Sequence, residues 1–442
     1  MLRDFRTVSF RILNDVFITR RWARESIEAN MKGLSDAHSD IKKVYELVYG
    51  IMRNKRLIDH CLAPFIRKPV EDPKLMNILR IGFYQLRHMD SIPPYAAVDS
   101  CVNLARQYIH PKTSGFVNAV LRSLLRSKKN IPEIPRKDEV AYQAILLSYE
   151  EWMARFFYRH FPDSAETIMK AGNSKPPIFL RVNTLKTTSQ KLLKKLKENG
   201  VLAEQLFFPK NAILVTSGDA VKTPSFEEGL FQVQDLSSQL LCEIISPSQK
   251  DAVIDVGSAP GGKTAAFSMA MSGMGKILAI EPQKSRITMM EQNFLRLGVT
   301  NAEIMQHDAT VPVAELEKKA DKVLVDAPCS ALGVIRRHPE KKWCITENEL
   351  KQFPGLQLAI LENSSAWVKK GGELFYSTCT LNPKENIGVA ERFLKKNRDF
   401  KAVDVCGRNP KLRAFRKGNY FQSAPGNSLN MDGFFIARFA RK

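Results

Sequence analysis

The sequence has few cysteines, and they are not spaced as metal ligands. Its seven cysteines are scattered through 442 residues without a Cys-x-x-Cys pair or a Cys/His cluster. An odd number of scattered cysteines argues against a disulfide framework and against a zinc site, so we expect no bound metal. Free thiols are typical of proteins of a reducing compartment.

Long hydrophobic runs are missing as well. The N-terminal stretch MLRDFRTVSFRILNDVF lacks the uninterrupted apolar core of a signal peptide. No run approaches the roughly 18 apolar residues that span a bilayer. The hydrophobic share of 44% is nevertheless ample for globular cores. We therefore expect a soluble cytoplasmic protein, monomeric and without a membrane partner.

Acidic residues are scarce relative to basic ones. Asp and Glu total 46 against 67 Lys and Arg, which gives a formal net charge of +21. Because a basic surface attracts phosphates and releases their counterions, this excess favours a nucleic-acid partner. A solvated basic surface would give the same count, so charge alone does not identify the polyanion.

The length and the periodicity predict more than one domain. In the first part of the chain, apolar residues recur about every 3.6 positions, as they do along one face of a helix. This periodicity predicts an all-helical bundle over 1–135. The stretch NIPEIPRKDE, with two prolines, predicts a linker. Strand-like and helical stretches then alternate, including the basic SQKLLKKLKENG, and predict a small α+β subdomain over 136–225.

From about residue 250, short apolar runs alternate with helical stretches. The runs are AVIDVG, KILAIEP, AEIMQHDA, KVLVDAP, GELFYSTC, FKAVDV and FFIARFAR. Such alternation is typical of a doubly wound, mostly parallel sheet, so we predict an α/β domain over 226–442. Ligands of these sheets bind beyond the carboxyl ends of the strands, and Cys329 and Cys379 follow two of those ends.

A glycine-rich loop, DVGSAPGGKT, follows the first of these strands. Residues 257–264 match the G-x-x-x-x-G-K-[ST] pattern, so a P-loop nucleotide hydrolase is one interpretation. The other is a glycine turn against S-adenosylmethionine. Glu281 follows the second strand, where such folds hold a ribose, and Asp308 and Asp326 end the next two. The quoted loop opens with the acidic end of the first strand, so four consecutive strands end in an acidic residue. A crevice lined by four carboxylates would repel a triphosphate, which favours the methyl donor.

Two cysteines at one crevice suggest chemistry on a pyrimidine. Carbon 5 of the ring is a poor nucleophile until a thiolate adds at carbon 6, which is nucleophilic catalysis. Asp326, three residues before Cys329, could hydrogen-bond ring nitrogen 3. Lys263, Arg336 and Arg337 could favour a thiolate. Spacing alone does not rank the two cysteines. Others are expected to be small buried side chains: Cys61, Cys101, Cys242 and Cys406.

Longer stretches resemble known families. DAPCSALGVIRRHPEKKW, YSTCTLNPKEN, SAPGGKT, FLRVNT, FQVQDLSSQLL and DGFFIARF are similar to motifs of the RNA 5-methylcytosine methyltransferases of the Sun/Fmu family, which act on bacterial 16S ribosomal RNA. LRIGFYQLRHMDSIPPYAAVDSCVNLAR and GFVNAVLRSLLR resemble the antitermination-factor-B-like domain. The resemblance covers nearly the whole chain, and Glu281 and Glu340 stand where aspartate is commoner.

This resemblance implies a fold, a partner and roles for single residues. It implies a Rossmann-like S-adenosylmethionine-dependent methyltransferase domain, an RNA-binding helical domain, and 16S ribosomal RNA as substrate, naked or in a small-subunit assembly intermediate. Cys379 would attack carbon 6, and Cys329 would assist product release. Residues that would bind the cofactor or position the base are Gly257, Ser258, Ala259, Pro260, Gly261, Gly262, Lys263, Glu281, Asp308 and Asp326. Residues on the RNA side are Arg181, Asn183, Arg336 and Arg337.

Two alternatives remain open at this point. An RNA-stimulated P-loop NTPase would use the glycine-rich loop for phosphates, and a non-catalytic RNA-binding assembly factor would use only the basic surface. Retention of S-adenosylmethionine rather than ATP separates the first alternative from a methyltransferase, and loss of methylation on mutation of Cys379 disposes of the second.

Overall fold

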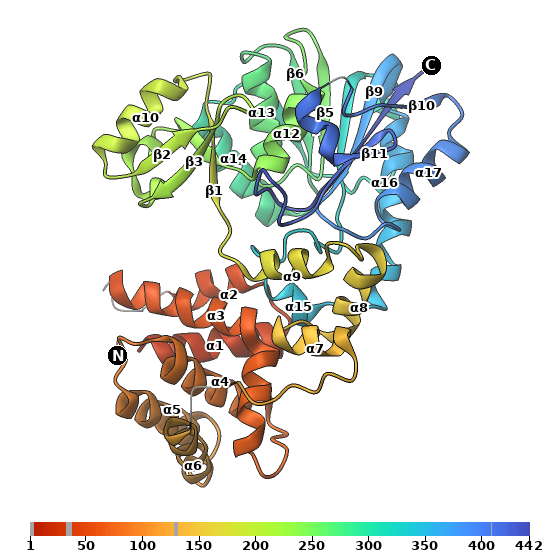
Figure 1. The fold of residues 1–442 in the computed structure, drawn as a ribbon. Helices are drawn as coiled ribbons and strands as arrows, with labels where there is room; N and C mark the ends of the chain where they lie inside the picture. Colours follow the sequence, from red (N-terminus) through yellow and green to blue (C-terminus); the bar gives the residue numbers. More distant parts are fainter. Residues whose placement is uncertain (1–3, 32–37, 128–130, 408) are drawn as a thin grey trace. The chain divides into compact units, whose positions relative to one another are not determined.

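The computed structural model describes residues 4–31, 38–127, 131–407 and 409–442. Their contacts divide the chain into two compact units. Unit 1 comprises Met1–Ser174 and Ile335–Glu347, and unit 2 comprises Lys175–Val334 and Asn348–Lys442. Among the described residues, helices are either too short or too polar to cross a lipid bilayer. Figure 1 colours both units along the sequence.

Unit 1 is built from helices over its described residues. They are α1 (Phe5–Phe17), α2 (Ala23–Asn30), α3 (His38–Leu62), α4 (Pro73–His88), α5 (Pro94–Tyr108), α6 (Thr113–Arg126), α7 (Glu139–Leu146), α8 (Glu151–His160), α9 (Ala165–Asn173) and α15 (Lys341–Cys344). Asp4 caps α1 by accepting a hydrogen bond from the backbone N–H of Arg6. The predicted apolar face of α1, including Val8, Ile12 and Val16, is buried in the helical core.

The segment 335–347 packs as a part of unit 1, although the sequence analysis assigned it to the α/β domain. Its Lys342 is fully buried. The ammonium donates hydrogen bonds to Arg53 O, Ser148 O and Asn173 Oδ1, each at 2.7 Å. Burial lowers the pKa of Lys342 well below its ordinary value, and these acceptors replace the water that the ammonium loses.

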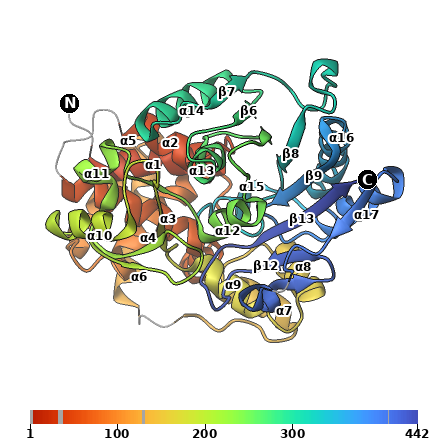
Figure 2. The same cartoon turned by 90° about the horizontal axis from the view of Figure 1, so that it is seen from above.

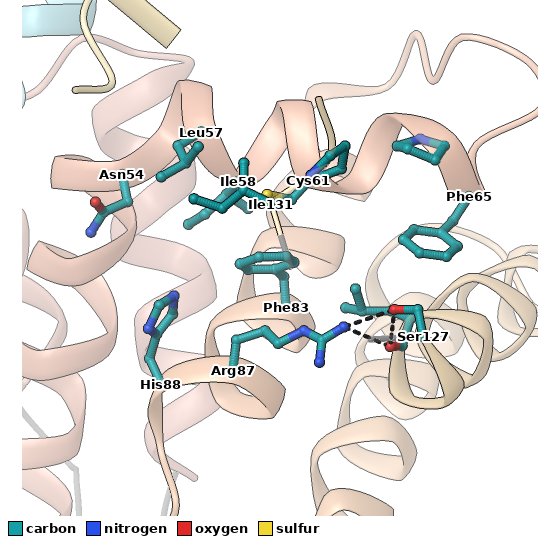
Figure 3. A pocket seen from close by; sticks show the side chains of 13 residues that line it. Asn54, Leu57, Ile58, Cys61, Phe65, Phe83, Arg87, His88, Ser127 and Ile131 are labelled. Atoms are coloured by element: carbon teal, nitrogen blue, oxygen red, sulfur yellow. Dashed lines mark hydrogen bonds between the residues drawn. The ribbon is translucent and has the colours of Figure 1, made fainter. Parts of the chain in front are cut away.

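A cavity of about 590 Å³ lies among helices of unit 1 (Figure 3). Arg87 on α4 donates to Leu124 O at 2.9 Å and to Ser127 Oγ at 2.8 Å, so its charge holds the end of α6. Cys61 also lines this cavity. Burial raises the pKa of the Cys61 thiol, which keeps it a neutral member of the core, as the sequence analysis expects.

Unit 2 begins with a small antiparallel sheet in the order β2–β3–β1–β4. Its strands are β1 (Ile178–Val182), β2 (Leu202–Gln205), β3 (Ala212–Ser217) and β4 (Phe231–Val233). The helix α10 (Ser189–Glu198) packs Leu192 and Leu196 against this sheet, and α11 (Pro224–Glu227) precedes β4. The predicted range 136–225 differs from this arrangement at both ends. Its first part, α7–α9, belongs to unit 1, and β4 lies beyond residue 225.

The larger sheet of unit 2 runs in the order β11–β12–β13–β9–β8–β5–β6–β7, with β10 paired to β13 (Figure 2). Its strands are β5 (Ala252–Val256), β6 (Lys276–Ile280), β7 (Ala302–Met305), β8 (Ala320–Asp326), β9 (Val368–Thr378), β10 (Phe400–Val403), β11 (Arg416–Lys417), β12 (Tyr420–Ser423) and β13 (Phe434–Arg441). The strands from β7 to β9 are parallel, and β13 is antiparallel to β9.

Helices cover both faces of this sheet (Figure 1). They are α12 (Leu236–Ile245), α13 (Gly262–Ala270), α14 (Lys284–Leu297), α16 (Phe353–Ser365) and α17 (Ile387–Lys396). Side chains alternate along each strand, so Leu324 of β8 packs with α12 and α13, whereas Val323 and Val325 pack with α16 and α17. This is the predicted doubly wound, Rossmann-like fold.

The chain changes direction across the sheet at β5. From β5 it proceeds to β6 and β7 on one side, and then returns to β8 and β9 on the other. The loops that follow β5 and β8 therefore diverge at a topological switch point, which is where open α/β sheets bind their ligands. The glycine-rich loop follows β5, and the Cys329 loop follows β8.

Candidate active site

The structure brings the two predicted cysteines together. Cys329 lies three residues beyond the end of β8, and Cys379 follows the last residue of β9. These strands are neighbours and parallel, with Asp326 opposite Ser377, so the two loops leave the same edge of the sheet. The sulfur atoms of Cys329 and Cys379 are 3.1 Å apart, and all seven cysteines are free thiols.

The two thiols differ in their surroundings. The hydrogen bond with Cys379, together with burial and the nearby Glu385, raises the pKa of Cys329 well above its ordinary value. Cys329 therefore keeps its proton near neutral pH, and either thiol can donate the hydrogen bond that joins the two sulfurs. A thiol held at this distance can stabilise negative charge that develops on its neighbour.

Glu385, from the YSTCTLNPKEN stretch, joins the two cysteine loops. Its side chain is fully buried. The carboxylate accepts hydrogen bonds from Ser330 N at 2.9 Å and Ser330 Oγ at 2.6 Å, in the loop of Cys329. It also accepts from Asn382 Nδ2 at 2.9 Å, in the loop of Cys379, and from Gln357 Nε2 at 2.9 Å. A buried carboxylate surrounded by donors fixes both loops relative to each other.

Further contacts lock the same loops. The hydroxyls of Ser330 and Thr380 are 2.6 Å apart. Gly333 N donates to Cys379 O at 3.0 Å, and Gly433 N donates to Gly333 O at 2.9 Å. A Cβ at Gly333 would collide with the carbonyl oxygen of Gly433, so this approach requires glycine. The backbone around Cys379 is therefore held by the segment 330–333, which is itself held by Gly433.

Asp326 is held by a cation and a hydroxyl. Lys263 Nζ, from the first turn of α13, lies 2.6 Å from Asp326 Oδ2, and Ser377 Oγ donates to Asp326 Oδ1 at 2.8 Å. Burial alone would lower the pKa of Lys263, but the carboxylates of Asp326 and Asp255 raise it above its ordinary value. The lysine of the apparent phosphate-binding motif is thus committed to a carboxylate, which argues against the P-loop interpretation.

The glycine-rich loop adopts a conformation that depends on its glycines. Gly257 and Gly261 have φ values of 73° and 92°, in the left-handed region. A Cβ at Gly257 would collide with Asp326 O, so the loops after β5 and β8 approach as closely as backbone allows. Ser258 N donates to Ile280 O at 3.2 Å, which ties the loop to the end of β6.

Glu281 is fully buried at the end of β6. Its carboxylate accepts from Gln283 N at 3.1 Å and from the Arg286 guanidinium at 3.1 Å. Arg286 also donates to Ala259 O at 2.9 Å, so this arginine links the carboxylate to the glycine-rich loop. The position matches that of the ribose-binding acidic residue in doubly wound folds.

The remaining acidic residues divide into one exposed and one buried group. Asp308, beyond β7, is exposed, and the N–H and hydroxyl of Thr310 lower the pKa of its carboxyl. Asp255, within β5, is fully buried and accepts from Thr264 Oγ1 at 2.6 Å. Burial raises the pKa of Asp255 to about 7, and only Thr264 and Lys263 oppose this rise. Asp255 thus belongs to the floor of the loop.

These residues fit S-adenosylmethionine. The backbone of the glycine-rich loop can approach a ligand closely, and Glu281 offers a carboxylate to ribose hydroxyls. A triphosphate would instead meet Glu281, Asp308 and Asp326, with Lys263 already neutralised by Asp326. In the part of the chain that the structure describes, His, Cys, Asp and Glu side chains do not gather into a metal-binding group of three or more.

The residues expected on the RNA side need correction. Asn183 is fully buried and donates to Gly229 O and Leu297 O at 2.8 and 2.7 Å. Arg181 donates to Gln234 Oε1 at 2.7 Å and Gln239 O at 2.6 Å, and burial lowers its pKa. Asn183 thus has no exposed surface for RNA, and Arg181 is only partly exposed, with its guanidinium bonded within the β1 region.

Arg336 and Arg337 belong to unit 1, not to the unit that carries the cysteines. Arg336 is only 1% exposed, which leaves it almost no surface for RNA. Arg337 is partly exposed. The sequence placed both next to Cys329 because they follow it closely in the chain, but the segment 335–347 turns into the helical core of unit 1.

The sequence analysis did not single out Glu385, Ser377 or Arg286. Glu385 lies in a stretch that was quoted for its cysteine, and a charged residue in the loop beyond a predicted strand gave no indication that it would be buried. Ser377 precedes Cys379 and faces Asp326 only because β8 and β9 pair in this register. Arg286 lies five residues beyond Glu281, in the first turn of α14, and no helical spacing connects it to a residue that precedes the helix.

Family models match three parts of the chain, and named relatives match most of its length. The family model "16S rRNA methyltransferase RsmB/F" matches residues 242–440, the model "NusB family" matches 3–126, and the ferredoxin-like domain of RsmF/B-like methyltransferases matches 149–222. The probable ribosomal RNA small subunit methyltransferase B of Bacillus subtilis is 33% identical over 403 residues, which cover 90% of each chain. The ribosomal RNA small subunit methyltransferase B of Pectobacterium atrosepticum is 30% identical and covers 91% of this chain and 92% of that one.

Solved structures share the fold. The crystal structure of PH0851 superposes with a TM-score of 0.83 at 23% identity and covers 98% of both chains. A methyltransferase homolog from Pyrococcus horikoshii has a TM-score of 0.59 at 27% identity and covers 69% of this chain and all of that one. NSun6 from the same organism, solved with SFG, has a TM-score of 0.57 at 24% identity and covers 65% and 97%.

Proposed function

Because the chain belongs to the RsmB/F family of S-adenosylmethionine-dependent ribosomal RNA methyltransferases, we propose that it methylates carbon 5 of a cytosine in 16S ribosomal RNA through a covalent adduct with Cys379. The observation that carries the proposal is the 3.1 Å contact between the sulfurs of Cys379 and Cys329. A methyltransferase acting by direct transfer needs no pair of thiols at its strand ends. The family also excludes the P-loop hydrolase and the non-catalytic factor.

The first step is the addition of Cys379. Its thiolate forms a bond to carbon 6 of the cytosine, and the electrons of the 5,6 double bond make carbon 5 nucleophilic. In this proposal the thiol of Cys329, whose sulfur lies 3.1 Å away, donates a hydrogen bond to this thiolate and stabilises it. Asp326, fixed by Lys263 and Ser377, accepts a hydrogen bond from the amino group or the protonated ring nitrogen of the base. S-Adenosylmethionine supplies the methyl group that carbon 5 takes up.

Elimination then restores the ring. The proton that Cys329 shares passes to the sulfur of Cys379 as the carbon–sulfur bond breaks. The Cys329 thiolate left behind accepts the proton of carbon 5, and the 5,6 double bond forms again. Both cysteines end as thiols, and Cys379 releases one proton before the next turnover. The high pKa of Cys329 makes its thiolate a strong base for this step.

The cofactor residues of the proposal are the glycine-rich loop from Gly257 to Lys263 with Glu281 and Asp308. Glu281 would hold the ribose, and the loop would pass along the methionine part. The helical unit, which matches the NusB model, would bind RNA, and the enzyme would act as a monomer in the cytoplasm, on naked RNA or on a partly assembled subunit.

Bisulfite sequencing of 16S ribosomal RNA tests the proposal. RNA from a strain without the gene should lack one 5-methylcytosine that the wild-type gene restores, and a Cys379→Ala gene should not restore it. A Cys61→Ala gene is the matched control, because that cysteine belongs to the helical core of unit 1 and not to the unit that carries the pair. An unchanged set of 5-methylcytosines in the deletion strain would contradict the proposal.

A further inference from the structure

Unit 2 has a second pocket, with an aromatic lining. Its cavity of about 510 Å³ lies between the connection from β2 to β3, the short helix η5 (Pro410–Phe415) and the loop that precedes β13. Aromatic side chains from β1, from the connection between β2 and β3 and from η5 line it: Phe179, Phe207, Phe208 and Phe415. Phe207 is 90% exposed, so a large flat ring stands in water at the rim. An exposed flat ring beside a cavity offers a stacking surface to a ligand.

The rim of this pocket is basic. Lys411 Nζ lies 3.8 Å from the centre of the Phe207 ring and 5.0 Å from that of Phe208. The sequence from 405 to 431 contains no Asp or Glu, but it contains the following basic residues: Arg408, Lys411, Arg413, Arg416 and Lys417. Of these, Lys411, Arg413, Arg416 and Lys417 are exposed, and Arg416 is paired with Asp404 at 2.9 Å. An aromatic surface beside positively charged side chains is complementary to a polyanion that carries flat rings.

The pocket is close to the catalytic cysteines along the chain. Asn430 lines the pocket, and Gly433, three residues later, donates to Gly333, which in turn donates to Cys379 O. Three residues span at most about 10 Å. A strand of RNA with its cytosine at Cys379 therefore has neighbouring nucleotides within reach of the pocket.

We propose that this pocket is a subsite that stacks an unpaired base of the substrate RNA close to the target cytosine. Phe207 and Phe208 supply the stacking surface, and Lys411 meets the adjoining phosphate. Proteins that recognise single-stranded RNA stack its unpaired bases on aromatic side chains. Any base can be held in this way, because every base has an aromatic face. A protein partner would not require the cations, so RNA is the occupant that the charge favours. The inference rests on the proposed function.

Steady-state methylation of 16S ribosomal RNA transcribed in vitro tests this subsite. Phe207→Ala should raise KM for the RNA about five- to 150-fold, the range that loss of one stacked base corresponds to. Its kcat and its KM for S-adenosylmethionine should stay unchanged, because the cofactor residues are untouched. Phe207→Tyr and Phe207→Trp should restore the RNA KM. Leu295→Ala, an 85% exposed position on α14, is the control that should change nothing.

The outcomes separate the subsite from the function itself. If wild-type protein methylates the RNA and Phe207→Ala has the same RNA KM, the subsite is wrong and the proposed function stands. A loss seen only on protein-containing small subunits, with naked RNA unaffected, would also overturn it and assign the pocket to a protein. If the wild type methylates no RNA, the proposed function fails. If the RNA KM is that of the wild type in Phe207→Tyr but is raised in Phe207→Leu, the ring acts by stacking rather than by simple apolar packing.

Discussion

The sulfur atoms of Cys329 and Cys379 lie 3.1 Å apart, although 50 positions separate the two residues in the sequence. The parallel pairing of β8 with β9 sends both loops from one sheet edge, and Glu385 then holds the loops together. The scaffold thus positions the proposed nucleophile and its proposed partner before RNA arrives. Such preorganisation is worth more in a reaction than the same groups would be in solution.

Replacing Glu281 by Ala should weaken binding of S-adenosylmethionine about ten- to a hundredfold, because a ribose loses a charged hydrogen-bond partner. The circular dichroism spectrum should be unchanged. Isothermal titration calorimetry measures the affinity. Glu291→Ala, an exposed carboxylate on the adjoining helix α14, is the matched control and should bind as the wild type does. Equal affinities for Glu281→Ala and wild type would remove Glu281 from the cofactor site.

Replacing Glu385 by Gln should slow methyl transfer about a hundredfold, because a misplacement of reacting groups by about 1 Å has an effect of that size. The amide must turn an NH₂ group towards donors such as Ser330 N or Asn382 Nδ2, and this separates the two loops. The free energy of unfolding should fall by about 1–3 kcal/mol. Single-turnover kinetics with labelled S-adenosylmethionine measures the rate.

The affinity of the Glu385→Gln variant for S-adenosylmethionine should stay within a few-fold of the wild-type value, because Glu385 contacts the cysteine loops and not the glycine-rich loop. Glu391→Gln, an exposed position on α17, is the control. If cofactor affinity and transfer rate fall together, Glu385 supports the whole domain rather than the cysteine pair.

Asp255 should make unfolding depend on pH between about 4 and 7. Its folded pKa is about 7, above the ordinary value of 3.8, so the folded chain binds a proton in this range that the unfolded chain has lost. Its contribution is therefore full below pH 4 and is lost as the pH rises through 7, with a slope of at most about 1.4 kcal/mol per pH unit.

Urea unfolding of wild type and Asp255→Asn at several pH values isolates the contribution of Asp255 to the free energy of unfolding. The difference in unfolding free energy should change in favour of the Asn variant between pH 5 and pH 8, because Asn cannot ionise. A difference that is constant over this range would mean that Asp255 titrates normally in the folded protein.

Several features could be predicted from the sequence because they follow local patterns. The buried strands, the acidic residues at their ends and the apolar face of α1 recur at the spacings that sheets and helices impose. The adjacency of Cys329 and Cys379 also follows, since carboxyl ends of parallel neighbours meet at one edge. The G-x-x-x-x-G-K-[ST] pattern was ambiguous because the role of its lysine depends on a tertiary contact. Lys263 resembles a phosphate ligand in the sequence, but the folded chain places Asp326 beside it.

Other features depend on tertiary contacts that leave no local pattern. The segment around Lys342 enters unit 1 because its ammonium finds carbonyl acceptors on three separate segments of that unit. Arg181 and Asn183 resemble exposed binding residues, yet their partners are backbone carbonyls and a glutamine distant in sequence. The burial of Glu385 required donors from positions 330 and 357, which no periodicity connects.

The central claim is that Cys379 forms an adduct with the base that Cys329 helps to break down. Denaturing electrophoresis after incubation with S-adenosylmethionine and labelled 16S ribosomal RNA measures it directly. Cys329→Ala should accumulate a protein–RNA complex that survives denaturation, because attack and methylation proceed and elimination does not. Cys379→Ala and the double variant should accumulate none, since removal of the earlier step hides the later one. An adduct in Cys379→Ala alone would exchange the two roles, and no adduct in any variant would contradict covalent catalysis by this pair.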